Sequence, residues 1–277
     1  MRIDFLRKDI HKTHGKCLTH PCDKVRSNPI RVVSLLILVC SLMLPTAAFA
    51  QVTVNNVIVT FLAGQRPIQN VLVGNSSDHP AYVQARLEKV LNPGKGGDKS
   101  EPSNDLLISP KTFSIEPNGQ RAVRFLLRKV AKDTEGVYRV LFTPQDRGFG
   151  QEVKQSVGGR TASIRVLTGM GVLVFVEPKN PVGHLKWART KKGVTFRNDG
   201  NIHVELGEGK LCFEEKCEVA PRKRVYAGDT FEVAVSGQNS IQYLVRTGAS
   251  GVFEALSIPP LKDGESSGEI RPAAFRK

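Results

Sequence analysis

The feature that most constrains this chain is a succession of short apolar runs with the two-residue period of β-strands. From Val52 onward, these runs are separated by clusters of Gly, Asn, Pro and Ser, and no convincing helical period of ten or more residues occurs. Seven or so strands fit between residues 51 and 178, and a smaller set fits between 179 and 260. This pattern is typical of immunoglobulin-like β-sandwiches, so we predict an all-β protein with two such domains.

One predicted strand, Thr161–Pro178, changes character along its length. Its first half alternates, with Ile164, Val166 and Thr168 on one face, whereas Val172–Val176 is continuously apolar. Alternation indicates a strand with one buried face, and a β-branched apolar run indicates a strand buried on both faces. From the residues alone, the alternating row either faces the chain's own core or forms an edge that is open to another protein.

Several further segments carry simpler predictions. The pattern predicts one continuous strand over Val52–Phe61 and solvated Gly-rich loops at Asn92–Asp105 and Arg147–Arg160. The first loop contains Gly94-Lys95-Gly96-Gly97, but no GKS/T sequence in a strand-to-helix context follows, so phosphate binding is not predicted. The polar segment 261–277 is predicted to be a disordered tail.

The N-terminus has the order of regions found in a secretory signal. A basic segment ends at Arg31, the apolar run Val32–Leu44 follows, and Ala48-Phe49-Ala50 provides an A-x-A cleavage site. The apolar run is too short to span a bilayer comfortably, which disfavours a retained anchor. Residues 1–50 are therefore predicted to be a signal peptide with an extended basic region, cleaved after about Ala50, leaving an exported protein with no stable membrane anchor.

The charge and the dispersed histidines argue against two functional classes. Residues 1–50 hold eight basic and three acidic residues, which leaves 32 basic and 23 acidic residues in the remainder. These basic residues are scattered and lack a motif of stacking aromatic residues, so nucleic-acid binding is not predicted. The histidines lie in no catalytic or metal-binding motif, so we predict neither an enzyme nor a metal site or cofactor.

Two cysteines, Cys212 and Cys217, remain after the predicted leader is removed. An even pair in an exported chain indicates a disulfide, and the four intervening residues suffice for a hairpin turn. The alternative is half of a metal site, but the sequence offers no two further ligands near the pair, since only His203 lies close. We predict a disulfide that joins adjacent strands.

The order of motifs resembles the PapD-like family of periplasmic pilus-assembly chaperones. The segments that carry the resemblance are Leu106–Pro110, Phe113–Gln120, Val123-Arg124, Glu135–Val140, Thr161–Pro178, Asn198–Val204, Gly209–Cys212 and Tyr226–Gly228. The resemblance implies a boomerang of two immunoglobulin-like domains, at 51–178 and 179–260. It also implies a periplasmic location.

The same resemblance implies how such a chain would work. The last strand of the first domain would be lent to a fimbrial subunit that lacks its own final strand, and the subunit would then pass to an outer-membrane usher. In this sequence the lent row corresponds to Ile164, Val166 and Thr168, with Met170 as its extension. The alternative function is an exported structural or adhesive component of a surface fibre.

Two departures from the family pattern concern charge. The family's cationic pair, which holds the subunit's terminal carboxylate, is matched here by Ile58 and Gly171–Leu173, so other cations would be needed; Lys179, Lys186 and Arg189 are the nearest candidates in the sequence. The family's arginine before the strand-ending proline is Glu177 here. We therefore predict an inverted interdomain pair, Glu177 with Arg246, beside Glu135.

Overall fold

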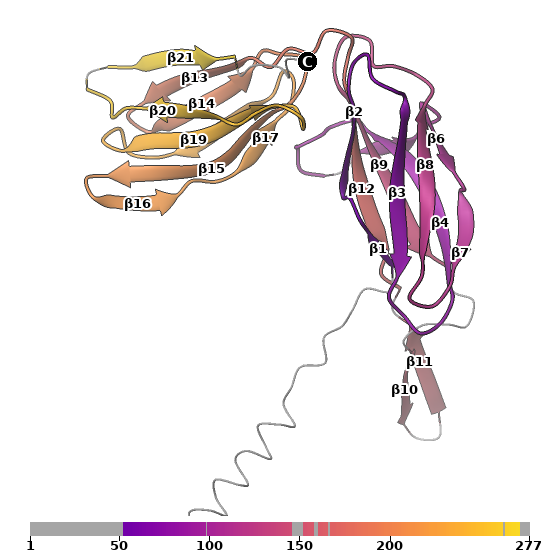
Figure 1. Cartoon of the computed structure of the whole chain (residues 1–277). Helices are drawn as coiled ribbons and strands as arrows, with labels where there is room; N and C mark the ends of the chain where they lie inside the picture. The colour runs from indigo at the N-terminus through magenta and orange to yellow at the C-terminus, as the bar shows by residue number, and fades with distance from the viewer. Residues whose placement is uncertain are drawn as a thin grey trace, which may run out of the picture. The chain divides into compact units, whose positions relative to one another are not determined.

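The computed structural model describes residues 52–97, 99–145, 152–157, 160–165, 167–262 and 264–271. Every regular element in these ranges is a β-strand, which confirms the all-β prediction (Figure 1). No helix in the described ranges is long and apolar enough to cross a membrane.

Two groups of strands form two sandwiches. The strands of the first are β1 (Val52–Val54), β2 (Ile58–Phe61), β3 (Ile68–Asn75), β4 (Ala81–Val90), β5 (Ser100–Pro102), β6 (Leu106–Ser109), β7 (Thr112–Ile115), β8 (Gln120–Leu127), β9 (Gly136–Pro144) and β12 (Met170–Val176). Between β9 and β12 lies a hairpin of β10 (Glu152–Val157) and β11 (Arg160–Arg165). The strands of the second are β13 (Leu185–Thr190), β14 (Gly193–Asn198), β15 (Val204–Phe213), β16 (Lys216–Val219), β17 (Lys223–Val225), β18 (Thr230–Ala234), β19 (Ser240–Thr247), β20 (Glu254–Ile258) and β21 (Ser266–Ile270).

The N-terminal sandwich packs two sheets face to face. One has the order β1-β3-β8-β6, and the other has the order β2-β12-β9-β4-β5 with β7 paired to β4. Alternate residues of both sheets point inward, and the aromatic rings of Phe125 and Phe142 stack in the core at a centroid distance of 6.4 Å. The alternation of apolar and polar residues in the sequence therefore corresponds to inward-facing and outward-facing positions on these strands.

The first predicted strand, Val52–Phe61, is wrong as a single element. The chain leaves β1, which pairs with β3 in one sheet, and enters β2, which pairs in parallel with β12 in the other sheet. At the crossing point, Asn55 exchanges hydrogen bonds with Leu72: its N–H donates to the Leu72 carbonyl at 3.0 Å, and its Oδ1 accepts from the Leu72 N–H at 2.8 Å. The Asn55 side chain therefore supplies the acceptor for the Leu72 N–H at the point where the chain crosses from one sheet to the other.

The C-terminal sandwich has its own core. Its sheets have the orders β18-β14-β13-β21 and β16-β15-β19-β20, with β17 paired to β15. Phe196 and Tyr243, one from each sheet, meet edge to face at 5.7 Å. The prediction of a disordered tail over 261–277 is wrong for Ser266–Ile270, because these residues form β21 and pair with β13.

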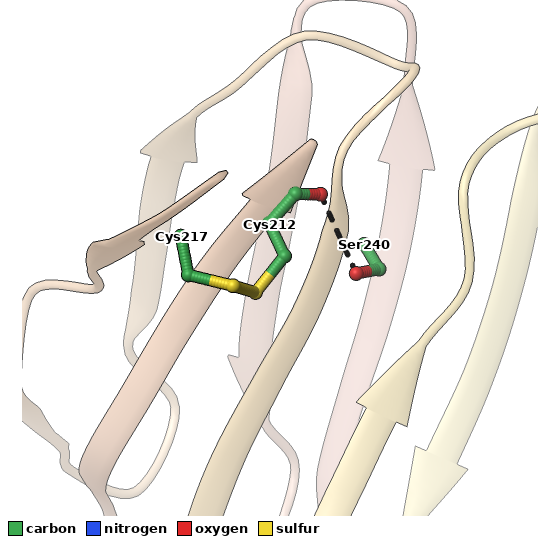
Figure 2. Close-up of a disulfide and its surroundings, with 3 residues drawn as sticks. All are labelled: Cys212, Cys217 and Ser240. Carbon is green, nitrogen blue, oxygen red and sulfur yellow. Dashed lines mark hydrogen bonds between the residues drawn. A yellow bond between two sulfur atoms is a disulfide. The ribbon is translucent and has the colours of Figure 1, made fainter. Parts of the chain in front are cut away.

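The predicted disulfide is confirmed. Cys212 and Cys217 occupy opposite positions on β15 and β16, and their sulfur atoms are bonded at 2.06 Å. The Ser240 hydroxyl on β19 donates to the Cys212 carbonyl at 3.4 Å (Figure 2). The disulfide therefore joins the two strands of the hairpin, and the Ser240 hydrogen bond links that hairpin to β19.

Candidate functional site: an open strand edge beside a buried joint

The strands β11 and β12 carry an edge that no described strand covers. β11 pairs with β10 on one side only, and its other side has no partner among the described residues. β12 pairs with β9 along its whole length, but its pairing with β2 begins only at Leu173, opposite Ile58. The second side of Met170–Val172 therefore lies open in the part of the chain that the structure describes. Open strand edges present unpaired N–H and C=O groups that can pair with another chain.

The prediction of one unbroken strand over Thr161–Pro178 is wrong. Described residues 167–169 belong to no strand and separate β11 from β12. Gly169 lies against β9 so closely that an added Cβ would stand 2.9 Å from the Phe142 carbonyl oxygen. Only glycine tolerates this approach, and the chain can change direction there.

The structure separates the four residues predicted to form the lent row. Ile164 lies in β11 opposite Val153 of β10, whereas Val166 lies outside the described residues. Thr168 is exposed in the break, and Met170 begins β12 and packs against the N-terminal core. Further along β12, Val172 and Val174 are fully buried.

The loop predicted at Arg147–Arg160 is wrong in part. Glu152–Val157 forms β10 and pairs with β11 from Glu152↔Arg165 to Val157↔Arg160. Its sequence, EVKQSV, has a weak apolar alternation that gave no strand signal. β11 is thus paired with β10 on the side opposite its open edge.

The open edge leads directly into a buried joint between the two sandwiches. The Glu135 carboxylate, in the loop before β9, accepts from the His203 ring Nδ1 at 2.7 Å and from the His203 backbone N–H at 3.2 Å. Both side chains are almost completely enclosed, with exposed fractions of 3% for Glu135 and 0% for His203. The Glu135 N–H also donates to the Asn201 carbonyl at 2.8 Å. The structure thus places Glu135 at the joint, with His203 as a partner that sequence reasoning did not identify.

Glu177, the residue that follows β12, is also buried at this joint. Its Oε2 accepts from the Ala63 N–H at 3.3 Å. Burial raises the pKa of the Glu177 carboxyl above its ordinary value, and the nearby Glu135 carboxylate adds to this rise, while the Ala63 N–H and His203 oppose it.

The predicted Glu177–Arg246 pair is wrong. The Arg246 guanidinium bonds to the Glu205 carboxylate on the neighbouring strand, and it stacks on the Phe253 ring at 4.6 Å. Arg246 lies in β19, directly opposite Glu205 of β15. The guanidinium therefore pairs with this cross-strand neighbour and not with a residue of the other sandwich.

The three basic residues named from the sequence as candidates for holding a subunit's carboxylate have different surroundings. Lys186 pairs with Asp199 at 2.8 Å, and Arg189 is fully buried, donating to the carbonyls of Ser236, Gly237 and Asn239. The buried Arg189 is therefore not available to a partner's carboxylate. Lys179 is exposed after β12.

The loop that was predicted to be merely solvated contributes to the joint. Lys95 pairs with Asp229 at 3.0 Å, and Lys223 donates to the Gly94 carbonyl at 3.0 Å. Part of the same predicted loop, Ser100–Pro102, forms the short strand β5. Both pairs have exposed members, so they orient the two sandwiches more than they stabilise them.

Within the described ranges, no group of three or more His, Cys, Asp or Glu side chains is arranged to hold a metal ion. The one disulfide there consumes Cys212 and Cys217.

The first sandwich matches a known family of chaperone domains. Residues 51–181 match the family described as pili and flagellar-assembly chaperone, PapD N-terminal domain. Residues 51–181 therefore form a domain of this family. This family is non-enzymatic, and its members are two-domain all-β proteins of immunoglobulin-like fold. No curated protein matches the chain significantly by sequence.

Solved structures of fimbrial chaperones share the fold of this PapD-like chain. The class 5 fimbriae chaperone CfaA matches with a TM-score of 0.54 and 18% identity, over 75% of this chain and 97% of that chain. A complex of the Salmonella enterica SafA pilin with the SafB chaperone matches with a TM-score of 0.54 and 16% identity, over 77% of this chain and 98% of that chain. The Acinetobacter baumannii CsuC–CsuE pre-assembly complex matches with a TM-score of 0.51 and 16% identity, over 76% and 99%.

Proposed function

We propose that this PapD-like chaperone binds fimbrial subunits by lending them the open edge of β11 and the start of β12. The single observation that supports this most is the side of β11 that has no strand partner among the described residues, followed after the break at 167–169 by Met170–Val172, whose second side is also unpaired there. A subunit that lacks its final strand exposes an apolar groove with unpaired edges, and it needs both backbone hydrogen bonds and alternating apolar side chains.

The row that would fill the groove is Ile164, Val166, Thr168 and Met170. These residues are spaced two apart and continue the even-numbered series of Val172 and Val174, which face the N-terminal core. A strand that carries such a row could extend a core from the chaperone into a subunit. Solved complexes of a chaperone with a pilin and with a tip subunit support a subunit as the partner of this chain too.

The site of action follows from the same proposal. We expect residues 1–50 to direct export and to be removed after about Ala50, so that the chaperone works in the periplasm. There it would hand each subunit to an outer-membrane usher. An oxidising compartment also suits the disulfide between Cys212 and Cys217. We propose 51–178 and 179–260, the latter extended by β21, as its two domains.

The test is co-purification from the periplasm of cells that express the tagged chain. We expect a one-to-one complex with a fimbrial subunit, identified by its peptides. The double substitution Ile164→Asp and Val166→Asp should abolish this complex, because two carboxylates would be buried in an apolar groove.

The matched control is Leu107→Asp, which places the same charge at an exposed apolar position on β6, in the other sheet. It should leave the complex intact, and all variants should keep the wild-type melting temperature within a few degrees. If the double variant still binds the subunit, or if the chain itself is found in sheared surface fibres, the proposal is wrong.

A further inference from the structure

The joint between the sandwiches contains two acidic side chains that no lysine or arginine neutralises. Glu177 forms no ion pair with a lysine or arginine of the described residues, and only 7% of its surface is exposed. Glu135 lies close enough for its charge to act on Glu177, and His203 is its one ionic partner among the described residues. The Oε1 of Glu135 and the Nε2 of His203 are both buried without a hydrogen-bond partner in the described structure. Buried charge without a counter-charge is costly.

The remaining charged and titratable groups around the joint do not remove this cost. Arg224 comes from β17, its guanidinium lies over the Phe175 ring at 5.6 Å, and its positive charge acts on the Tyr226 hydroxyl. Its Nε is buried without a hydrogen-bond partner in the described structure. Burial also raises the pKa of the Tyr226 hydroxyl, so that group stays neutral at neutral and acidic pH.

Both sandwiches enclose Glu177. Ala63 of the N-terminal sandwich donates to its Oε2. On the other side, Gly248 of the C-terminal sandwich lies so near that an added Cβ would be 3.4 Å from its Oε1. Separating the sandwiches would therefore return the Glu177 carboxylate to water.

We propose that the joint is a proton-dependent contact, in which a proton taken up at Glu177 tightens the packing of one sandwich on the other. The charged carboxylate favours the open joint, where water solvates it, and the neutral acid favours the closed joint. The sign follows from the raised pKa of Glu177: its stabilising contribution is complete below the ordinary glutamate pKa and is lost as the pH rises through the raised value. Because Glu177 directly follows β12, the proton also acts on the segment that carries the open edge.

The Glu135 amide reports the state of this joint, because its N–H donates to the Asn201 carbonyl of the other sandwich. We would measure its hydrogen exchange in the full chain from pH 4.5 to 7.5, correct for intrinsic exchange, and use the amides of β8 as internal references. In the wild type, its protection should rise as the pH falls, by at most about tenfold per pH unit for one proton. In Glu177→Gln, protection should be high and nearly independent of pH.

The chain offers a matched control pair on its surface. His184 and Glu269 also bond at 2.7 Å, but Glu269 is 48% exposed. Glu269→Gln should leave the pH dependence of the Glu135 amide unchanged. The inference is overturned if wild-type protection does not depend on pH, or if Glu177→Gln keeps the wild-type dependence.

A second measurement serves if the Glu177 variant does not fold. The carboxyl ¹³C resonance of Glu177 in the wild-type chain should titrate above the ordinary glutamate range. Titration within or below that range would contradict the inference by itself. Neither experiment involves a fimbrial subunit, so its outcome is independent of the proposed function.

Discussion

At the scale of single residues, two buried asparagines perform the same task in the two sandwiches. Asn75 donates to the carbonyls of His79, Ile115 and Glu116, and Asn198 donates to the carbonyls of Ile202 and Val225. Each amide oxygen accepts from a backbone N–H two residues later, Ser77 and Gly200 respectively. One amide side chain therefore satisfies backbone groups on several segments at once.

Asn198→Asp should destabilise the C-terminal sandwich. The carboxylate would face two carbonyl oxygens, each 2.8 Å from the present amide nitrogen, and would leave both without a donor. We expect a loss of about 3 kcal/mol in the free energy of unfolding at neutral pH, measured by urea denaturation, with a smaller loss in acid where the protonated group can donate.

The control is Asn180→Asp, which makes the same chemical change at an exposed position. It should alter the unfolding free energy by less than about 0.5 kcal/mol. A loss of that small size for Asn198→Asp as well would show that the buried amide does not hold the segments together.

The burial of both asparagines could not be predicted from the sequence, because local composition carries no information on which carbonyls a side chain will meet. The same limit explains the wrong pairing of Glu177 with Arg246. Charge complementarity along the chain was visible, but the register that places Glu205 opposite Arg246 was not. His203 was missed at the joint because a lone histidine has no motif.

At the scale of elements, the sequence predicted strands well where one face is buried and poorly where both faces are polar. Ser266–Ile270 became β21 although its sequence, SSGEI, has almost no apolar character. Pairing with β13 makes it a strand, and β13 is distant in the sequence. The break between β11 and β12 was missed for the opposite reason, since apolar residues lie on both sides of Gly169.

The disulfide should act on one hairpin more than on its domain. It closes a loop of only five residues in sequence separation, and all four residues of β16 are exposed. Replacing both Cys212 and Cys217 by alanine should lower the unfolding free energy by at most about 2 kcal/mol. Hydrogen exchange should become faster in β16 and stay unchanged in β14.

Ser240→Ala is the control for this hairpin, because it removes only the hydroxyl bond to the Cys212 carbonyl. It should cost less than the double alanine variant. Collapse of the whole C-terminal sandwich after loss of the bridge would show that its core depends on the disulfide.

At the scale of the whole molecule, two separate apolar cores explain why the division into two sandwiches was predictable. One core gathers the inward residues of β1–β4, β6–β9 and β12, and the other gathers those of β13–β15 and β17–β20. Binary patterning along each strand encodes these cores. At the joint, the resemblance pointed to Glu135 and Glu177 but not to His203, because these residues are far apart in the sequence and meet only in the folded chain.

The central claim is that the edge formed by β11 and the start of β12 is lent to a fimbrial subunit. Deuterium exchange of the chain alone and in its complex with the co-purified subunit tests it most directly, because a new strand partner must protect backbone amides. We predict slower exchange within Arg160–Arg165 and Met170–Val172 in the complex. Unchanged exchange in both segments, with new protection on another face, would contradict the claim.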